Sequence, residues 1–242
     1  MPGKRILLLG GTAEARGLAA ALINAGHAVV TSLAGVTQNP MLPNGELWLG
    51  GFGGERGLYD YLLSRDFDAL VDATHPFAAR ISRNGFDAAR RAGIPYVRLE
   101  RQPWAPMPGG QWIEVLGVEG AVAALPQAAR VMLTIGRKEI VPFLARGDLS
   151  GVARMIEPPV IALTSRWKLI LARPPFSVEG EKSLLARENI THLVTKNAGG
   201  GQTEAKLLAA RELDMTVVMI GRPQKPPAQT FATVEETVAA LR

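Results

Sequence analysis

Short apolar runs alternate with segments of helical periodicity along the first hundred residues. The run Arg5–Leu9 predicts a buried strand, and Leu18, Leu22 and Ile23 share one face of a helix predicted over residues 12–25, which Gly26 ends. Further strands are predicted at residues 27–33, 47–49, 69–72 and 95–99, with helices at 57–65 and 77–92. Alternation at this spacing predicts βαβ units around a parallel sheet.

A second set of such units follows a segment rich in proline. Residues 101–110 contain three prolines and a glycine pair, a composition typical of a linker. Strands are then predicted at 131–134, 153–156, 192–195 and 217–220, and helices at 203–213 and 234–241. We therefore expect an α/β protein of two Rossmann-like, doubly wound halves with parallel sheets and an inter-domain cleft. The expected halves are residues 1–103, which would bind a cofactor, and 104–242, with further cofactor contacts and the substrate cleft. The pattern does not decide to which half the last helix belongs.

Composition narrows the chemistry. The 242 residues include no cysteine and only three histidines, which excludes disulfides and thiolate sites and disfavours a zinc centre. The net charge of +5 is spread without a basic run, so we expect no nucleic-acid partner. The uncharged stretch 17–45 is interrupted by polar residues and prolines, so we expect no membrane span and a cytoplasmic protein. Arginines outnumber lysines 20 to 7, which favours an anionic small-molecule partner, although a GC-rich genome would give the same bias.

Ligands of open α/β sheets bind at the carboxyl ends of strands, so the loops after the strands are the candidate sites. After the first strand, Gly10 and Gly11 allow close approach of a phosphate, and Thr12 can cap the next helix. The loop lacks the G-x-G-x-x-G fingerprint because Thr12 and Ala15 replace two glycines, and a tight turn without a ligand is the alternative. At the end of the second strand Ser32 has no acidic neighbour, which favours NADP over NAD.

Three later loops are more polar than plain turns require. Asp72-Ala73-Thr74-His75-Pro76-Phe77 follows a strand, and His75 can donate to a ligand or transfer a proton, unless Asp72 and Thr74 merely cap the helix. Thr134-Ile135-Gly136-Arg137-Lys138 and residues 195–203, with three consecutive glycines, follow two others. With Lys196, Thr203 and Lys206 nearby, the glycine run predicts an anion cradle; a flexible loop with solvated lysines is the alternative.

Four of these segments, in this order and over essentially the whole chain, resemble the precorrin-6A reductase family of cobalamin biosynthesis. They are Gly10-Gly11-Thr12-Ala13-Glu14, Asp72-Ala73-Thr74-His75-Pro76-Phe77-Ala78, Thr134-Ile135-Gly136-Arg137 and Thr195-Lys196-Asn197-Ala198-Gly199-Gly200. The resemblance implies hydride transfer from NADPH, without flavin or metal, to a double bond of an anionic tetrapyrrole, giving the dihydro product (precorrin-6B). One departure is Val36, where the family often has a basic residue.

The resemblance also assigns site residues. We expect the cofactor to contact Gly10, Gly11, Thr12, Glu14, Ser32, Thr74, Thr134, Gly136, Arg137, Asn197, Gly199 and Gly200. His75 and Lys196 are the expected catalytic residues, since ring reduction also needs a proton, although water could supply it. The product would be handed to neighbouring pathway enzymes. The alternatives are a cobalt-precorrin-6A reductase that uses NADH, another NADP-linked enzyme such as a sugar-nucleotide reductase or epimerase, and a non-catalytic NADP-binding sensor.

Overall fold

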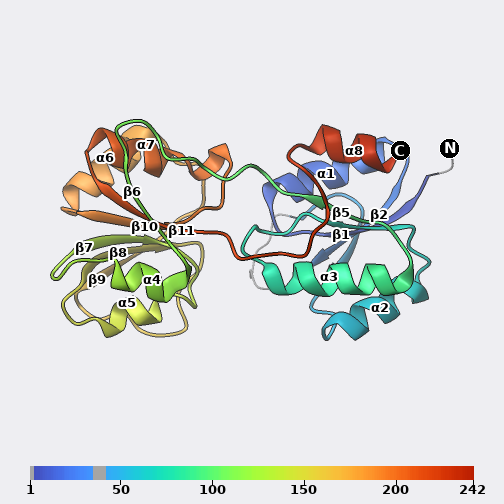
Figure 1. The fold of residues 1–242 in the computed structure, drawn as a ribbon, viewed down its shortest axis with the longest axis horizontal. Coiled ribbons are helices and arrows are strands. Elements are labelled where there is room, and N and C mark those ends of the chain that lie inside the picture. Colours follow the sequence, from blue (N-terminus) through green and yellow to red (C-terminus); the bar gives the residue numbers. More distant parts are fainter. Residues whose placement is uncertain (1–2, 35–41) are drawn as a thin grey trace. The chain divides into compact units, whose positions relative to one another are not determined.

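The computed structural model describes residues 3–34 and 42–242 and divides the chain into two compact units (Figure 1). The first unit contains residues 1–102 and 223–242, and the second contains residues 103–222. Each has its own six-stranded parallel sheet with helices on both faces. The doubly wound α/β fold predicted for both halves is therefore confirmed.

The first unit has the strand order of a Rossmann sheet. Its order is β3-β2-β1-β4-β5-β12, formed by β1 (Arg5–Leu9), β2 (Ala28–Leu33), β3 (Glu46–Leu49), β4 (Ala69–Asp72), β5 (Tyr96–Leu99) and β12 (Gln229–Phe231). In Figure 1 one face is covered by α1 (Ala13–Asn24) and α8 (Val234–Leu241), and the other by α2 (Glu55–Ser64) and α3 (Ala79–Ala92).

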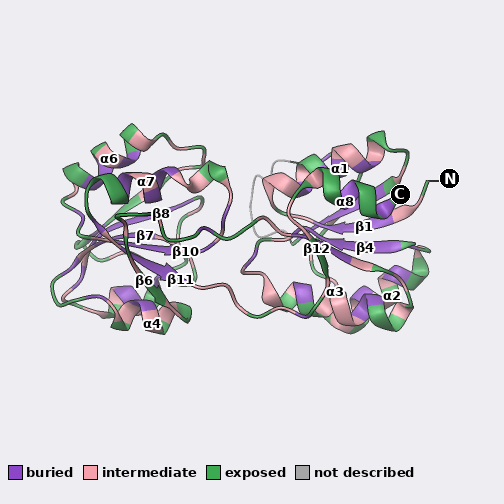
Figure 2. Ribbon diagram, turned by 45° about the horizontal axis from the view of Figure 1, so that its top comes forward, coloured by how far each residue is buried: buried purple, intermediate pink, exposed green. Residues whose placement is uncertain are grey.

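The central strand β1 explains why this unit has two cores. Successive side chains of a strand point to opposite faces of the sheet, so a strand covered on both sides is apolar throughout. Ile6 and Leu8 pack in the cluster that contains residues of α1 and α8, whereas Leu7 and Leu9 pack in the cluster of α2 and α3. These four side chains are at most 1% exposed, and purple in Figure 2 follows the same strand.

The second unit repeats the strand order with a different source for its sixth strand. Its order, β9-β8-β7-β10-β11-β6, comes from β6 (Gln111–Val115), β7 (Arg130–Thr134), β8 (Ser150–Met155), β9 (Trp167–Leu171), β10 (His192–Lys196) and β11 (Thr216–Ile220). Its helices are α4 (Gly117–Ala123), α5 (Val141–Ala145), α6 (Val178–Arg187) and α7 (Ala205–Glu212), with the 3₁₀ turn η1 (Gly201–Thr203) before α7. The last strand in this order, at one edge of the sheet, is β6, which comes before the other five strands along the chain. In the first unit the corresponding edge strand is β12, which comes after the other five.

The expected boundary needs one correction, because residues 223–242 return to the first unit. Strand β12 pairs in parallel with β5, and Val238 and Leu241 of α8 join the core beside α1. Two contacts fix the returning segment: Arg98 donates to the carbonyl of Pro226 at 3.0 Å, and Lys225 donates to Glu100 at 2.5 Å. No helix in the described part of the chain combines the length and apolar character of a membrane-spanning segment.

Candidate functional site

The loops after β1 and β4 meet where the strand order of the first unit reverses. At such a switch point the connections leave in opposite directions and open a crevice at the carboxyl ends of the strands. The two ends are adjacent because Leu9 and Asp72 are in register. The Thr12 hydroxyl accepts a bond from the amide of Ala15 at 3.0 Å, which confirms the predicted cap, and donates to the carbonyl of Ala73 at 2.9 Å. One side chain thus joins both loops.

The glycines of the first loop serve different purposes. A Cβ atom on Gly10 would lie 2.9 Å from the methyl group of Thr31, so glycine is needed there for packing against β2. Gly11 has a φ of +111°, and a Cβ atom there would meet no heavy atom within 4 Å. The space beside Gly11 is therefore open to a ligand, at the N-terminus of α1.

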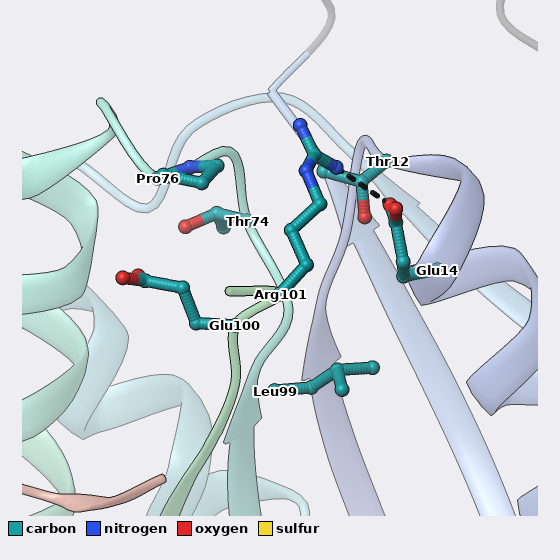
Figure 3. A pocket seen from close by; sticks show the side chains of 7 residues that line it. All are labelled: Thr12, Glu14, Thr74, Pro76, Leu99, Glu100 and Arg101. Carbon is teal, nitrogen blue, oxygen red and sulfur yellow. Dashed lines mark hydrogen bonds and ion pairs between the residues drawn. The ribbon is translucent and has the colours of Figure 1, made fainter. Parts of the chain in front are cut away.

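A pocket lies at the carboxyl ends of β1, β4 and β5 (Figure 3). It is lined by Thr12, Glu14, Thr74, Pro76, Leu99, Glu100 and Arg101. Arg101 donates to Glu14 at 2.8 Å, and Figure 3 shows Glu100 pointing away from this pair. Thr12, Glu14 and Thr74 were expected here. Glu100 and Arg101 were not predicted. Arg101 begins the proline-rich segment interpreted as a linker, and Glu100 lies between that segment and the strand predicted at 95–99.

Asp72, the last residue of β4, fixes the loop that follows this strand. Its side chain is completely buried, and one carboxylate oxygen accepts from the amide of Thr74 at 3.0 Å and from the Thr74 hydroxyl at 2.6 Å. The other oxygen accepts from the Tyr96 hydroxyl at 2.8 Å and lies 3.7 Å from Nε of Arg98. Burial raises the pKa of Asp72, but hydrogen bonds from neighbouring hydroxyls and the charge of Lys225 outweigh it, so this pKa lies below its usual value. The carboxylate is thus held ionised.

The alternative in which Asp72 and Thr74 cap the following helix is wrong. Helix α3 begins after Ala78, which makes no side-chain capping bond. His75 is exposed, and its Nδ1 accepts from the amide of Phe77 at 3.2 Å, which leaves Nε2 to carry the proton of the neutral ring.

Ser32 lies at the carboxyl end of β2, beside the first loop. Ser32 is buried, and its backbone carbonyl accepts from the amide of Gly10 at 2.9 Å. Val36, the departure from the family pattern, lies outside the described residues.

In the second unit, the loops after β7 and β10 occupy the equivalent switch point. Lys196 is paired with Glu139 at 2.5 Å, and the same oxygen of Glu139 accepts from the amide of Gly136 at 2.9 Å. Arg137 donates to Glu157 at 3.2 Å, and the Thr134 hydroxyl donates to the carbonyl of Val194 at 3.2 Å. The structure therefore brings Gly136 and Lys196 together through Glu139, a residue that was not predicted to belong to the site.

Asn197, for which a ligand contact is predicted, has a structural role in its described contacts. Its side-chain oxygen accepts from the amide of Trp104 at 2.8 Å, and its amide donates to the carbonyl of Trp104 at 2.9 Å. The side chain thus anchors the start of the second unit. Arg222 holds the same loop, since it donates to the carbonyls of Asn197 and Ala198 at 2.9 and 3.1 Å.

The glycine run and Lys206 also have structural explanations. Gly199 and Gly200 have φ values of +71° and +80°, which favour glycine whether or not a ligand binds. Lys206 is 4% exposed, donates to the carbonyl of Thr203 at 2.6 Å and lies 4.7 Å from the ring centre of Trp104. The Lys206 side chain is therefore buried within the second unit, so it does not extend into solvent as the predicted anion cradle requires.

Comparisons with known proteins agree with the sequence resemblance. Residues 5–242 match the family described as "Precorrin-6x reductase CbiJ/CobK". The precorrin-6A reductase of Rhodococcus erythropolis is 48% identical over 239 residues, covering 98% of this chain and 96% of the relative. The cobalt-precorrin-6A reductase of Priestia megaterium is 33% identical over 251 residues, covering 98% and 97%. A solved structure of CobK precorrin-6A reductase is 42% identical, covers 98% of this chain and 96% of its own, and superposes with a TM-score of 0.92. The chain belongs to the precorrin-6x reductase family, CbiJ/CobK.

Proposed function

We propose that this protein reduces precorrin-6A with NADPH, adding hydride to one double bond of the macrocycle. The observation that carries the proposal is the nearly full-length match to precorrin-6A reductases, with 48% identity to the Rhodococcus erythropolis protein against 33% to the cobalt-precorrin-6A reductase of Priestia megaterium. The higher identity favours the cobalt-free substrate. The lack of cysteine and the family's biosynthetic role support a cytoplasmic location, where the product would pass to the next enzyme.

The first unit fits a dinucleotide at the loop after β1. Gly11 leaves open space where a side chain would otherwise block the approach of a phosphate, and it lies two residues before the first residue of α1, whose N-terminus favours an anion. Ser32, at the end of the neighbouring strand, would contact the ribose end, and its lack of an acidic neighbour favours NADPH. When bound, NADPH supplies the hydride. Glycine, threonine and serine here bind and orient it.

His75 and Lys196 remain the proposed proton donors. His75 follows Thr74, which lines the pocket. As a proton donor it would act as the imidazolium and donate from Nε2, and in that form Nδ1 would no longer accept from the amide of Phe77. Lys196 is held by Glu139, which fixes the ammonium group at the end of β10. Arg137 would contact the cofactor in exchange for Glu157, and the carboxylates of the tetrapyrrole would pair with other cationic side chains, since the chain has 20 arginines.

The proposal is tested by adding purified protein to precorrin-6A and NADPH without oxygen and following the loss of reduced nicotinamide absorbance. Parallel reactions use NADH and the cobalt-containing substrate. Oxidation that depends on precorrin-6A and favours NADPH is expected. Tight NADPH binding without turnover of either tetrapyrrole would instead indicate the sensor.

His75→Asn and Lys196→Gln test the proton donors. Loss of a general acid lowers the rate by about 10²- to 10⁴-fold. We expect kcat to fall by this factor in the variant that lacks the true proton donor, while the affinity of that variant for NADPH stays unchanged. Asparagine at position 75 retains an acceptor for the amide of Phe77, so the turn is preserved. Full kcat in both variants would assign the proton to water.

A further inference from the structure

An acidic side chain stands where a dinucleotide phosphate is expected. Glu14 is the second residue of α1, so its carboxylate lies at the positive end of the helix dipole. An unpaired carboxylate there would repel a phosphate. Arg101 prevents this, since its Nη1 donates to Glu14 at 2.8 Å and both side chains are partly buried, with 19% and 32% exposure.

We propose that Arg101 binds the diphosphate of the dinucleotide and that Glu14 holds its guanidinium group in position. The inference rests on the proposed function. Figure 3 shows the Arg101 side chain running between Thr74 and Thr12, with its guanidinium group at the first turn of α1. A guanidinium group has five N–H donors in one plane, and its geometry suits two phosphate oxygens at once.

The strand order identifies the diphosphate as the group bound. A 2′-phosphate would lie at the end of β2, which is separated from β5 by β1 and β4. With neighbouring strands about 4.8 Å apart, β2 and β5 are roughly 14 Å apart. Arg101 follows β5 by two residues and reaches back only as far as the helix after β1. The diphosphate of a bound dinucleotide lies on that helix N-terminus.

The test compares binding of NADP⁺ and NAD⁺ to the full chain and to Arg101→Gln by calorimetric titration. The diphosphate is common to both dinucleotides. We therefore expect the affinities for NADP⁺ and NAD⁺ to fall by the same factor, about 10- to 100-fold, the range for a charged hydrogen bond. Their ratio stays unchanged. Arg90→Gln removes the same charge from an exposed position of α3 and leaves both affinities unchanged.

Each other outcome overturns the assignment. A fall confined to NADP⁺ would place Arg101 at the 2′-phosphate. Unchanged dinucleotide binding with a raised KM for the tetrapyrrole would place it at a substrate carboxylate. A lower melting temperature with unchanged affinities would make the pair structural only. If the unaltered protein binds neither dinucleotide, the cofactor proposal fails as well, whereas binding that Arg101→Gln leaves intact refutes only this inference.

The role of Glu14 is tested in the double variant Glu14→Gln/Arg101→Gln. If Glu14 acts by holding Arg101, the double variant binds NADP⁺ no more weakly than Arg101→Gln alone. A further, additive loss of affinity would show that Glu14 contacts the ligand itself and would overturn its positioning role.

Discussion

Asp72→Asn is expected to lower kcat/KM by about tenfold or more and the free energy of unfolding by about 2 to 4 kcal/mol. The buried carboxylate accepts both bonds that shape the Thr74 turn and faces Nε of Arg98. Asparagine can still accept the bonds from Thr74, but its NH₂ group then faces two donors, Tyr96 and Arg98. We expect the turn that carries Thr74 and His75 to shift. Steady-state kinetics and chemical denaturation measure the two effects.

The matched control is Tyr96→Phe, which removes the donor on the other side of Asp72 and leaves both bonds from Thr74 in place. It should cost about 1 kcal/mol of stability and leave kcat/KM unchanged. If Tyr96→Phe loses as much activity as Asp72→Asn, the effect comes from general loosening of the unit rather than from the Thr74 turn. Full activity in Asp72→Asn would remove the positioning role of Asp72 altogether.

The difference in the free energy of unfolding between Asp72→Asn and the unaltered protein should become smaller as the pH falls. Because the pKa of Asp72 in the folded protein lies below its value in the unfolded chain, about 3.9, its ionised form stabilises the fold above that pH. This contribution is lost as the pH falls through the folded pKa, and the variant has none to lose. Denaturation curves at pH 7 and at successively lower pH should therefore show the difference narrowing only below about pH 4. A difference that is constant into strong acid would contradict the assignment.

The central strands were predictable because they are apolar on both faces. Strands β1, β4, β7, β10 and β11 are nearly continuous runs of buried residues, and each was found from the sequence. The strands missed were β6, β9 and β12, all at sheet edges. An edge strand pairs with only one neighbouring strand, and more of its surface is exposed to solvent. Its burial pattern is therefore mixed: Leu169 and Leu171 of β9 are exposed, for example. A short run with exposed apolar and charged residues gives a weak signal, although the edge strand β3 was predicted at 47–49.

The loops of the candidate site were predictable and their ion pairs were not. The rule that ligands bind at strand ends directs attention to the loops that carry Thr12, Thr74 and Lys196, and the first two of these residues line the pocket of the first unit. It gave no information about Glu139 and Glu157, which pair with Lys196 and Arg137, or about Arg101, which is 87 positions from Glu14. Such pairs depend on which strands become neighbours. The return of residues 223–242 to the first unit was not predicted, and only the place of the last helix was left open. The reason is the same, since the contacts of this segment with Arg98 and Glu100 cross more than 120 positions.

Glu181→Ala is expected to destabilise the second unit by about 3 to 5 kcal/mol, the usual cost of leaving a buried charge without its partner. Arg154, on β8, is 7% exposed and Glu181, on α6, is 2% exposed. Both terminal nitrogens of Arg154 donate to Glu181, one of them at 3.1 Å, and the guanidinium group lies 3.8 Å from the ring centre of Phe176. The pair therefore fixes α6 to the sheet, and the alanine variant leaves the guanidinium group buried and uncompensated.

The neighbouring residue supplies the matched control. Lys182 on the same helix pairs with Glu212 at 2.7 Å, but both side chains are more than a third exposed. Lys182→Ala should therefore cost less than about 1 kcal/mol. Tryptophan fluorescence during chemical denaturation measures both variants, because Trp104, Trp112 and Trp167 belong to the second unit and only Trp48 belongs to the first. Equal losses in the two variants would show that burial does not set the cost. Replacing both buried partners, as Arg154→Met/Glu181→Leu, should recover most of the stability, because no unpaired charge then remains in the core.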